Sequence, residues 1–442
     1  MTARELALRV VRDVFPDAAG APERSAHAAF DYHVRRAQLS ERDVAFAAEL
    51  AYGAIKMRRA LDWYLAFDAP QVEKLRTLAP LIREVLRLGV YELVYTRADE
   101  YATVFEFVNL AKRFGHRGIA NLVNAVLRRF LRDPRKDLTR ERFTDEHEYL
   151  ATRYSLPTWL VRQWGRTFPA SLEAICAAVD EPAQAAVTID TRRWTPEEAA
   201  AQLQDRGTAT RPSSVVPESL LLESGRAPER ADQGWWPQSE SSAMPVDVLN
   251  PQPGESIADL CSGRGNKALQ IGARLKNVGS LLCVERDERK AAVLGRRLEA
   301  AGLTAGVVVG DATAELLPSD RLFDRVLLDA PCSGTGIVGR QPEARWKKQS
   351  TDGERLASTQ RALLERAARY VYPGGALVYA VCSTDPRETS DVMEWFLSRE
   401  NFERGLIPAP YEGLLTPEGD VLVPPGIAGR DGFYICRVER RA

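Results

Sequence analysis

Residues 256–274 read Ser256-Ile-Ala-Asp-Leu-Cys-Ser-Gly-Arg-Gly-Asn-Lys-Ala-Leu-Gln-Ile-Gly-Ala-Arg274. A short apolar run that ends at Asp259 predicts a strand, and the glycines Gly263 and Gly265 predict a tight turn. The residues after Gly265 have the apolar spacing of a helix. Free backbone N–H groups at the start of such a helix can receive the polar groups of a ligand. The stretch therefore predicts the first strand–turn–helix unit of a ligand-binding α/β fold.

The alternation of strands and helices continues after this unit. Strands are expected at residues 256–259, 279–285, 306–309, 323–329 and 376–382, and helices at 267–274, 288–301 and 356–370. This order is typical of a doubly wound parallel sheet, in which ligands bind at the carboxyl ends of the strands. We expect residues 234–442 to form this Rossmann-like α/β domain.

The rest of the chain is organised differently. Residues 1–140 have apolar side chains at helical spacing, for example Leu122, Val123, Val126 and Leu127, and predict an all-α domain. Residues 141–233 predict a small α/β connector. Its expected elements are a helix over 149–164, a strand over 185–190 and a helix capped by Thr195.

The end of the helical region is basic. Its Lys and Arg residues are Lys112, Arg113, Arg117, Arg128, Arg129, Arg132, Arg135, Lys136, Arg140 and Arg142, against the acids Asp133, Asp137 and Glu141. A solvated helix face and a phosphate-contacting surface both fit this pattern.

The composition excludes several classes of protein. With 60 Lys and Arg against 61 Asp and Glu in 442 residues, the net charge is −1, so the chain is no polycationic DNA-coating protein. No apolar run reaches the ~18 residues that cross a bilayer. Six widely spaced cysteines predict neither a zinc site nor a disulfide framework. We expect a cytoplasmic protein with reduced thiols, no resident metal and no membrane segment.

Two acidic residues at later strand ends indicate a nucleoside site. Glu285 ends the second strand, 20 residues after Gly265, where a carboxylate can bind both ribose hydroxyls. Asp311 follows the third strand, where it can hold an adenine amino group. A dinucleotide and S-adenosylmethionine both fit, although Ala268 replaces the third glycine of a dinucleotide loop. A purely structural turn is the remaining reading of the loop.

Two cysteines follow the fourth and fifth strands. They lie in Asp329-Ala-Pro-Cys332-Ser-Gly-Thr-Gly and in Val381-Cys382-Ser-Thr. One such cysteine alone is more often a small buried apolar residue. Two of them at neighbouring ligand-facing strand ends predict a catalytic pair of thiols.

With these motifs the sequence resembles the Sun- or Fmu-type (RsmB-like) ribosomal RNA cytosine-5 methyltransferases, which carry an N-terminal NusB-like helical domain. The resemblance covers essentially the whole chain. It rests on Leu39-Ser-Glu-Arg-Asp, Glu49-Leu-Ala-Tyr-Gly-Ala, Leu86-Arg-Leu-Gly-Val-Tyr-Glu-Leu, Asn121-Leu-Val-Asn-Ala-Val-Leu-Arg-Arg, Arg153-Tyr-Ser-Leu-Pro-Thr-Trp, Trp236-Pro-Gln-Ser-Glu-Ser-Ser, the two cysteine motifs and Asp431-Gly-Phe-Tyr.

The resemblance implies a class I methyltransferase domain and a set of roles. It makes Cys382 the nucleophile that attacks cytosine C6, Cys332 the residue that helps to expel it, and Asp329 the group that binds the base. The residues implied for S-adenosylmethionine are Cys261, Ser262, Gly263, Arg264, Gly265, Asn266, Lys267, Glu285, Asp311 and Asp329. The partner implied is ribosomal RNA with a single-stranded or flipped cytosine, and Arg128, Arg129 and Arg132 are expected to contact its phosphates.

The chain departs from the family in two places near the cofactor. The first loop reads Cys261-Ser-Gly-Arg-Gly-Asn-Lys-Ala where the family usually has Cys-Ala-Ala-Pro-Gly-Gly-Lys-Thr, and Glu285 stands where an aspartate is common. Neither departure touches the two cysteines.

Three other functions stay open at this point. They are a NusB-type RNA-binding transcription factor with a vestigial catalytic domain, the same chemistry on transfer RNA or DNA, and a small-molecule dehydrogenase. Intact Cys332 and Cys382 argue against the first and the last. The sequence does not set the oligomeric state, and a monomer is the simplest expectation.

Overall fold

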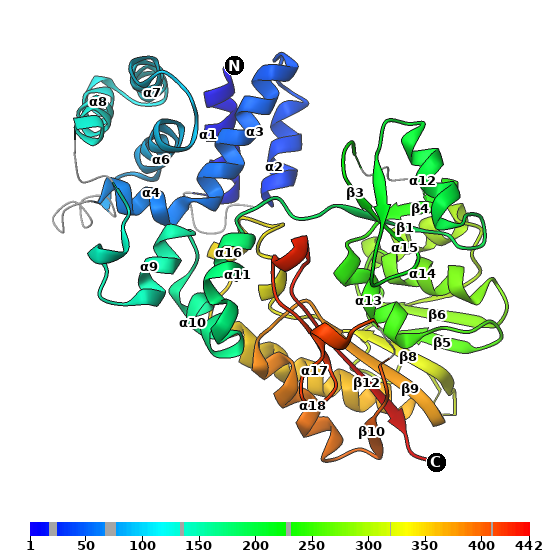
Figure 1. Ribbon diagram of the computed structural model, residues 1–442. Helices are drawn as coiled ribbons and strands as arrows, with labels where there is room; N and C mark the ends of the chain where they lie inside the picture. Colours follow the sequence, from blue (N-terminus) through cyan, green and yellow to red (C-terminus); the bar gives the residue numbers. More distant parts are fainter. Residues whose placement is uncertain (17–23, 67–76, 133–136, 227–230, 319, 408–409) are drawn as a thin grey trace. The chain divides into compact units, whose positions relative to one another are not determined.

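The computed structural model describes residues 1–16, 24–66, 77–132, 137–226, 231–318, 320–407 and 410–442 (Figure 1). These residues form two compact units. Unit 1 consists of Met1–Arg162 together with Arg340–Lys348, and unit 2 consists of Gln163–Gly339 together with Gln349–Ala442.

Unit 1 is helical throughout its described residues, which confirms the prediction for this part of the chain. Its longer helices are α1 (Ala3–Val14), α2 (Ala26–Val34), α3 (Glu41–Lys56), α4 (Arg58–Leu65), α6 (Pro80–Tyr95), α7 (Glu100–Phe114), α8 (Arg117–Arg132), α9 (Glu146–Arg153) and the start of α10 (Thr158–Thr167). Thr2, Ser25, Ser40 and Asp99 cap four of them by accepting a backbone N–H bond.

The single helix expected over residues 149–164 is wrong, because the chain breaks there into α9 and α10. Ser155 between them has a φ of 49°, and its hydroxyl accepts hydrogen bonds from the backbone N–H groups of Arg59 and Ala60. Pro157 cannot donate a helical hydrogen bond and disfavours helical backbone in the residue before it. The break is therefore a local consequence of Pro157, stabilised by α4.

A short segment from late in the chain completes unit 1. Helix α16 (Ala344–Lys347) contains Arg345, which is buried and donates to the carbonyl of Ser155 at 3.1 Å. The indole of Trp346 donates to the carbonyl of Ile55 at 2.7 Å. No pattern in the sequence indicates that this segment belongs with the helical unit.

Unit 2 contains two sheets. The smaller one is antiparallel in the order β2-β3-β1-β4, and helix α12 (Pro196–Gln204) packs on it. Its strands are β1 (Ala186–Ile189), β2 (Thr210–Pro212), β3 (Ser219–Leu222) and β4 (Trp235–Pro237). Thr195 and Glu198 form a capping box at the start of α12. This confirms the prediction that Thr195 caps the helix.

The larger sheet has the order β10-β12-β9-β8-β5-β6-β7, with β11 paired to β12. The strands are β5 (Ser256–Asp259), β6 (Ser280–Glu285), β7 (Gly306–Val309), β8 (Phe323–Asp329), β9 (Val371–Val381), β10 (Phe402–Arg404), β11 (Val421–Val423) and β12 (Phe433–Arg440). Strands β5 to β9 pair in parallel, which confirms the five strands predicted from the sequence. Strands β10 to β12 are antiparallel additions that sequence analysis missed.

Helices cover both faces of the larger sheet (Figure 1). They are α13 (Glu240–Leu249), α14 (Asn266–Leu275), α15 (Glu288–Ala300), α17 (Asp352–Arg369) and α18 (Ser390–Leu397). Ile257 and Leu327 join a core with α13, α14 and α15, whereas Ala258 and Leu328 join a second core with α17 and α18. Successive strand residues therefore supply opposite cores, as a doubly wound sheet requires.

A buried ionic network joins the smaller sheet to the helices of the larger one. Glu218, just before β3, accepts two hydrogen bonds of 2.7 Å from Arg274 on α14 and one of 2.8 Å from Gln270. Arg274 also pairs with Asp247 on α13. Burial opposes ionisation of Glu218, but the bonds from Arg274 and Gln270 outweigh it and hold the pKa of Glu218 below its ordinary 4.5.

We expect Glu218→Ala to destabilise unit 2 by about 3–5 kcal/mol, because it leaves part of a buried ion network unpaired. Urea denaturation at pH 7 measures the effect. The matched control is Glu223→Ala, which removes an exposed glutamate of the same hairpin and should change stability by less than about 0.5 kcal/mol. The network's contribution is complete above pH 4.5 and should be lost as the pH falls through the lower folded-state pKa of Glu218. Equal destabilisation by the two variants would contradict this account.

Candidate active site

The turn between β5 and α14 has the geometry that its glycines predict. Gly263 and Gly265 have φ values of 58° and 91°. A Cβ atom at position 265 would lie 2.4 Å from Cδ1 of Leu294, so the close approach of α15 also requires a glycine there. Gly265 is the N-cap of α14. The turn therefore presents backbone rather than side chains at the carboxyl end of β5.

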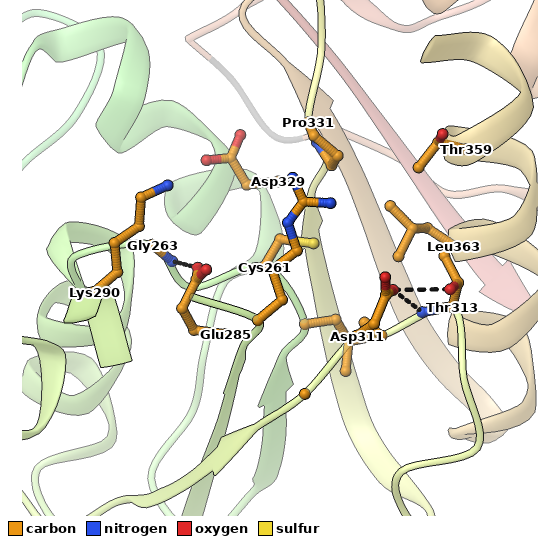
Figure 2. A pocket seen from close by; sticks show the side chains of 14 residues that line it. Cys261, Gly263, Glu285, Lys290, Asp311, Thr313, Asp329, Pro331, Thr359 and Leu363 are labelled. Carbon is orange, nitrogen blue, oxygen red and sulfur yellow. Dashed lines mark hydrogen bonds between the residues drawn. The ribbon is translucent and has the colours of Figure 1, made fainter. Parts of the chain in front are cut away.

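A cavity of about 200 Å³ lies at the carboxyl ends of the strands (Figure 2). Its lining residues are Leu260, Cys261, Gly263, Glu285, Arg286, Lys290, Gly310, Asp311, Ala312, Thr313, Asp329, Pro331, Thr359 and Leu363. Five residues predicted for cofactor binding are among them, namely Cys261, Gly263, Glu285, Asp311 and Asp329. These residues come from the ends of four adjacent parallel strands, as predicted for a ligand site in this fold.

Hydrogen bonds fix two of the carboxylates that line the cavity. Glu285 accepts from the backbone N–H of Gly263 at 2.8 Å and from that of Asp287 at 2.9 Å. Asp311 accepts from the backbone N–H and the hydroxyl of Thr313 at 2.9 and 2.8 Å, as Figure 2 shows. The bonds from Thr313 lower the pKa of Asp311, so this exposed carboxylate is an anion at neutral pH.

The other loop residues predicted to bind the cofactor do not line the cavity. The hydroxyl of Ser262 donates to the carbonyl of Asp259, and the amide of Asn266 donates to the carbonyl of Pro237. Gly265 turns the chain, and the side chain of Arg264 is exposed while its carbonyl accepts from Arg297. These residues shape the loop, and Cys261 and Gly263 are its members that face the cavity.

Lys267 reaches the site through a different contact. Its ammonium group lies 2.6 Å from the Asp329 carboxylate and 3.1 Å from the hydroxyl of Ser242. It also lies 5.5 Å from the centre of the Phe433 ring. This ion pair holds the Asp329 carboxylate at the end of β8, on the wall of the cavity.

The two cysteines predicted to be catalytic are in direct contact. Their Sγ atoms lie 3.3 Å apart, and both residues are half-buried. Strands β8 and β9 are parallel neighbours with Asp329 opposite Ala380, so Cys332 and Cys382 follow the ends of adjacent strands. The hydrogen bond to Cys382, burial and the nearby carboxylates of Glu388 and Asp329 raise the pKa of Cys332. Cys332 is therefore a protonated thiol at neutral pH.

Sequence analysis missed several residues of this region. Lys290 on α15, and Thr359 and Leu363 on α17, line the cavity but belong to helices whose pattern indicates only packing. Glu388, a buried carboxylate close to Cys332, was also missed. Its position six residues after Cys382 is the one signal that could have drawn attention to it.

The predicted basic surface lies on unit 1. Val123, Leu127 and Phe130 of α8 are buried in the helical core, whereas Arg128, Arg129 and Arg132 are exposed. Arg113 and Arg140 from the same cluster form ion pairs with Glu5 and Glu146. Arg135 and Lys136 lie outside the described residues.

Among the residues that the structure describes, no group of three or more His, Cys, Asp or Glu side chains is arranged to hold a metal ion. No helix formed by them is long and apolar enough to cross a membrane.

Three family models match the chain in succession. Residues 1–132 match the NusB family, and residues 156–228 match the ferredoxin-like domain of RsmF/B-like methyltransferases. Residues 246–439 match the model described as 16S rRNA methyltransferase RsmB/F. The ferredoxin-like match covers most of the predicted connector, residues 141–233, and assigns a fold to it.

The similarity to known proteins covers nearly the whole chain. The ribosomal RNA small subunit methyltransferase B of Thermus thermophilus is 35% identical, with 99% of this chain and 98% of that protein covered. The protein of the same name from Citrobacter koseri is 31% identical over 91% of this chain and 92% of its own length. The crystal structure of PH0851 shares the fold, with a TM-score of 0.80 and 21% identity over 100% of this chain and 99% of that one. The chain therefore belongs to the 16S rRNA methyltransferase RsmB/F family.

Proposed function

We propose that this chain transfers a methyl group from S-adenosylmethionine to C5 of a cytosine in ribosomal RNA, through a covalent bond between Cys382 and C6 of the base. The observation that carries the proposal is the pair of thiols 3.3 Å apart, one of which, Cys332, directly follows Pro331 on the wall of the cavity. The names of the relatives, ribosomal RNA small subunit methyltransferase B, support ribosomal RNA as the substrate.

The cavity residues fit the cofactor by their chemistry. Glu285 would bind the ribose hydroxyls, and Asp311 would accept a hydrogen bond from the adenine amino group. The backbone at Gly263 and the carboxylate of Asp329 would lie near the methionine part. Bound S-adenosylmethionine would supply an electrophilic methyl group attached to a sulfonium cation.

The protein's own contribution is to make C5 of cytosine nucleophilic. The Cys382 thiolate would form a bond from Sγ to C6, and the electron pair of the C5–C6 double bond would shift toward C4 and N3. Asp329, held by Lys267, would bind the N3/N4 edge and stabilise the charge that develops there. C5 would then have enamine character and could attack the methyl carbon, whose bond to the sulfonium would break and leave a neutral thioether.

The product forms when this covalent bond is broken. Loss of the C5 proton to solvent would return the electron pair of the C5–H bond to the C5–C6 bond, and the electron pair of the C6–Sγ bond would leave with Cys382 as a thiolate. Cys332, which is protonated and touches the Cys382 sulfur, is the group placed to assist that departure. The two thiols therefore have separate roles at successive steps.

The RNA substrate has to meet two requirements. Its target base has to be unstacked or single-stranded to reach the strand ends. Its phosphates would be bound in part by Arg128, Arg129 and Arg132 on the exposed face of α8. We assign residues 1–140 to a NusB-like RNA-binding domain, 141–233 to the connector and 234–442 to the methyltransferase domain.

Replacing the two carboxylates at the strand ends should weaken cofactor binding. We expect Asp311→Ala and Glu285→Ala each to cost about 1.5–3 kcal/mol of S-adenosylmethionine affinity, because each removes a charge-assisted hydrogen bond. Calorimetric titration measures this loss. Glu315→Ala, an exposed acid four residues after Asp311, is the matched control and should bind normally. Unchanged affinity in both site variants would place the nucleoside elsewhere.

The cysteine variants should fail at different steps. Cys382→Ala should be inactive and should form no covalent complex, because the nucleophile is gone. Cys332→Ala should accumulate a protein–RNA adduct that survives denaturing electrophoresis and depends on S-adenosylmethionine and on Cys382. Cys176→Ala, which removes a buried thiol of α11 (Leu172–Ala178), is the control and should behave as the unmodified protein. An adduct trapped in Cys382→Ala would reverse the two roles.

The arginines of α8 should contribute to the salt dependence of RNA binding. Replacing Arg128, Arg129 and Arg132 by Gln should reduce the slope of log K against log salt by up to about 2, since each neutralised phosphate contributes about 0.7 on a single strand. The control replaces Arg35, Arg36 and Arg42, three exposed arginines of the same unit, by Gln. An equal effect of both triples would show that α8 is not a specific contact surface.

A further inference from the structure

Glu388 is a fully buried carboxylate that hydrogen-bonds to the residues following Cys332 and Cys382. It lies in the short helix η5 (Pro386–Glu388) after β9 and has 0% of its surface exposed. Carboxylates are rarely buried to this extent unless they are paired, because burial costs hydration energy. The four groups that donate hydrogen bonds to the Glu388 carboxylate are uncharged. A buried carboxylate without a cationic partner contributes little to the stability of a fold, which suggests another role for it.

The partners of Glu388 belong to both cysteine motifs. Its Oε1 accepts from the backbone N–H of Ser333 at 2.8 Å, and its Oε2 accepts from the hydroxyl of Ser383 at 2.6 Å. The hydroxyl of Ser333 also donates to Oε2. Ser333 follows Cys332, and Ser383 follows Cys382. One carboxylate therefore ties together the backbone on which the two thiols are carried.

Two further contacts fix Glu388, one at its carboxylate and one at its backbone. The amide of Gln360 on α17 donates to Oε1 at 3.1 Å and to the carbonyl of Pro331 at 3.0 Å. The hydroxyl of Tyr379 donates to the backbone carbonyl of Glu388 at 2.7 Å. The link thus extends from β9 through Glu388 to α17 and back to the residue before Cys332.

We infer that Glu388 is a positioning residue for the reaction proposed above, holding the Cys332 and Cys382 sulfurs at the separation that their successive roles require. The role of Glu388 in the reaction rests on the proposed function, whereas its role in positioning the two cysteines rests on the hydrogen bonds. A carboxylate suits this task because it offers two acceptor oxygens and can take all four donors at once. Its negative charge also contributes to the raised pKa of Cys332.

The first test measures thiol positioning without RNA or cofactor. An azodicarboxamide oxidant takes up two hydrogens from a pair of adjacent thiols, which become a disulfide, and mass spectrometry of the digest detects the linked Cys332 and Cys382 peptides. The unmodified protein should form this link readily from an Sγ–Sγ separation of 3.3 Å. Glu388→Ala should slow it at least about 10-fold, since a displacement near 1 Å costs up to about 10²-fold in intramolecular reactions.

The conservative variant separates geometry from charge. Glu388→Gln keeps an acceptor oxygen for Ser333 and Gln360, and the serine hydroxyls can rotate to accept from its amide. It should form the link at close to the original rate. The matched control is Asp420→Ala, which removes another buried carboxylate of unit 2 whose partners are Arg404 and Tyr434. It should also leave the rate unchanged.

The second test measures methylation. Glu388→Ala should lower kcat by about 10- to 100-fold with an unchanged dissociation constant for S-adenosylmethionine, because Glu388 does not line the cofactor cavity. Glu388→Gln should restore most of kcat. If Glu388→Ala does not fold, Ser383→Ala removes the link from the other end and should show the same defects in a milder form.

The outcomes separate this inference from the proposed function. Normal disulfide formation in Glu388→Ala, or an equal loss in Asp420→Ala, would overturn the positioning role whatever the methylation result. Failure of Glu388→Gln to restore the rate would overturn it as well. If the disulfide assay behaves as expected but no cytosine is methylated by the unmodified protein, the positioning stands and the proposed function fails.

Discussion

The parallel pairing of β8 with β9 is the constraint on which the site depends. Because Asp329 lies opposite Ala380, the segments that follow β8 and β9 leave the sheet side by side at the same edge. A backbone bond of 3.1 Å from Gly336 to the carbonyl of Cys382 extends that pairing beyond the strands. A shift of the register by one residue would turn alternate side chains to the opposite face and separate the thiols. The pairing of the cysteines is thus a property of the sheet before it is a property of the loops.

The same edge collects negative charge, and this has consequences for the thiols. Burial, reinforced by the nearby carboxylates, raises the pKa of Cys261 and keeps this third cysteine a protonated thiol. The carboxylates are those of Asp259, Asp329, Glu285 and Asp311. Burial also raises the pKa of Asp259 to about 7. Arg286 and Lys290 line the same cavity, and Lys267 pairs with Asp329, so cationic side chains offset the carboxylates at this edge.

The sequence predicted the parallel strands and the chemistry at their ends, because both follow from local patterns. Apolar runs, four of which end in an acid or a cysteine, predicted β5 to β9, and the glycines predicted the turn at Gly265. The antiparallel strands β10 to β12 could not be predicted in this way, because their pairing depends on residues distant in sequence. The role of Glu388 could not be predicted for the same reason, since only the fold brings its partners Ser333 and Gln360 close to it.

The segment that follows the Cys332 motif belongs to the helical unit rather than to unit 2. After Gly339 the chain that carries Cys332 leaves unit 2, and Arg340–Lys348 is part of the helical unit. There the buried Arg345 bonds to the carbonyl of Ser155, and Trp346 bonds to that of Ile55. Without the helical unit a buried arginine and a tryptophan of this segment would lose their acceptors, which costs free energy for each unpaired donor. The helical unit is therefore a structural support for the segment that follows the Cys332 motif, in addition to any role in binding RNA.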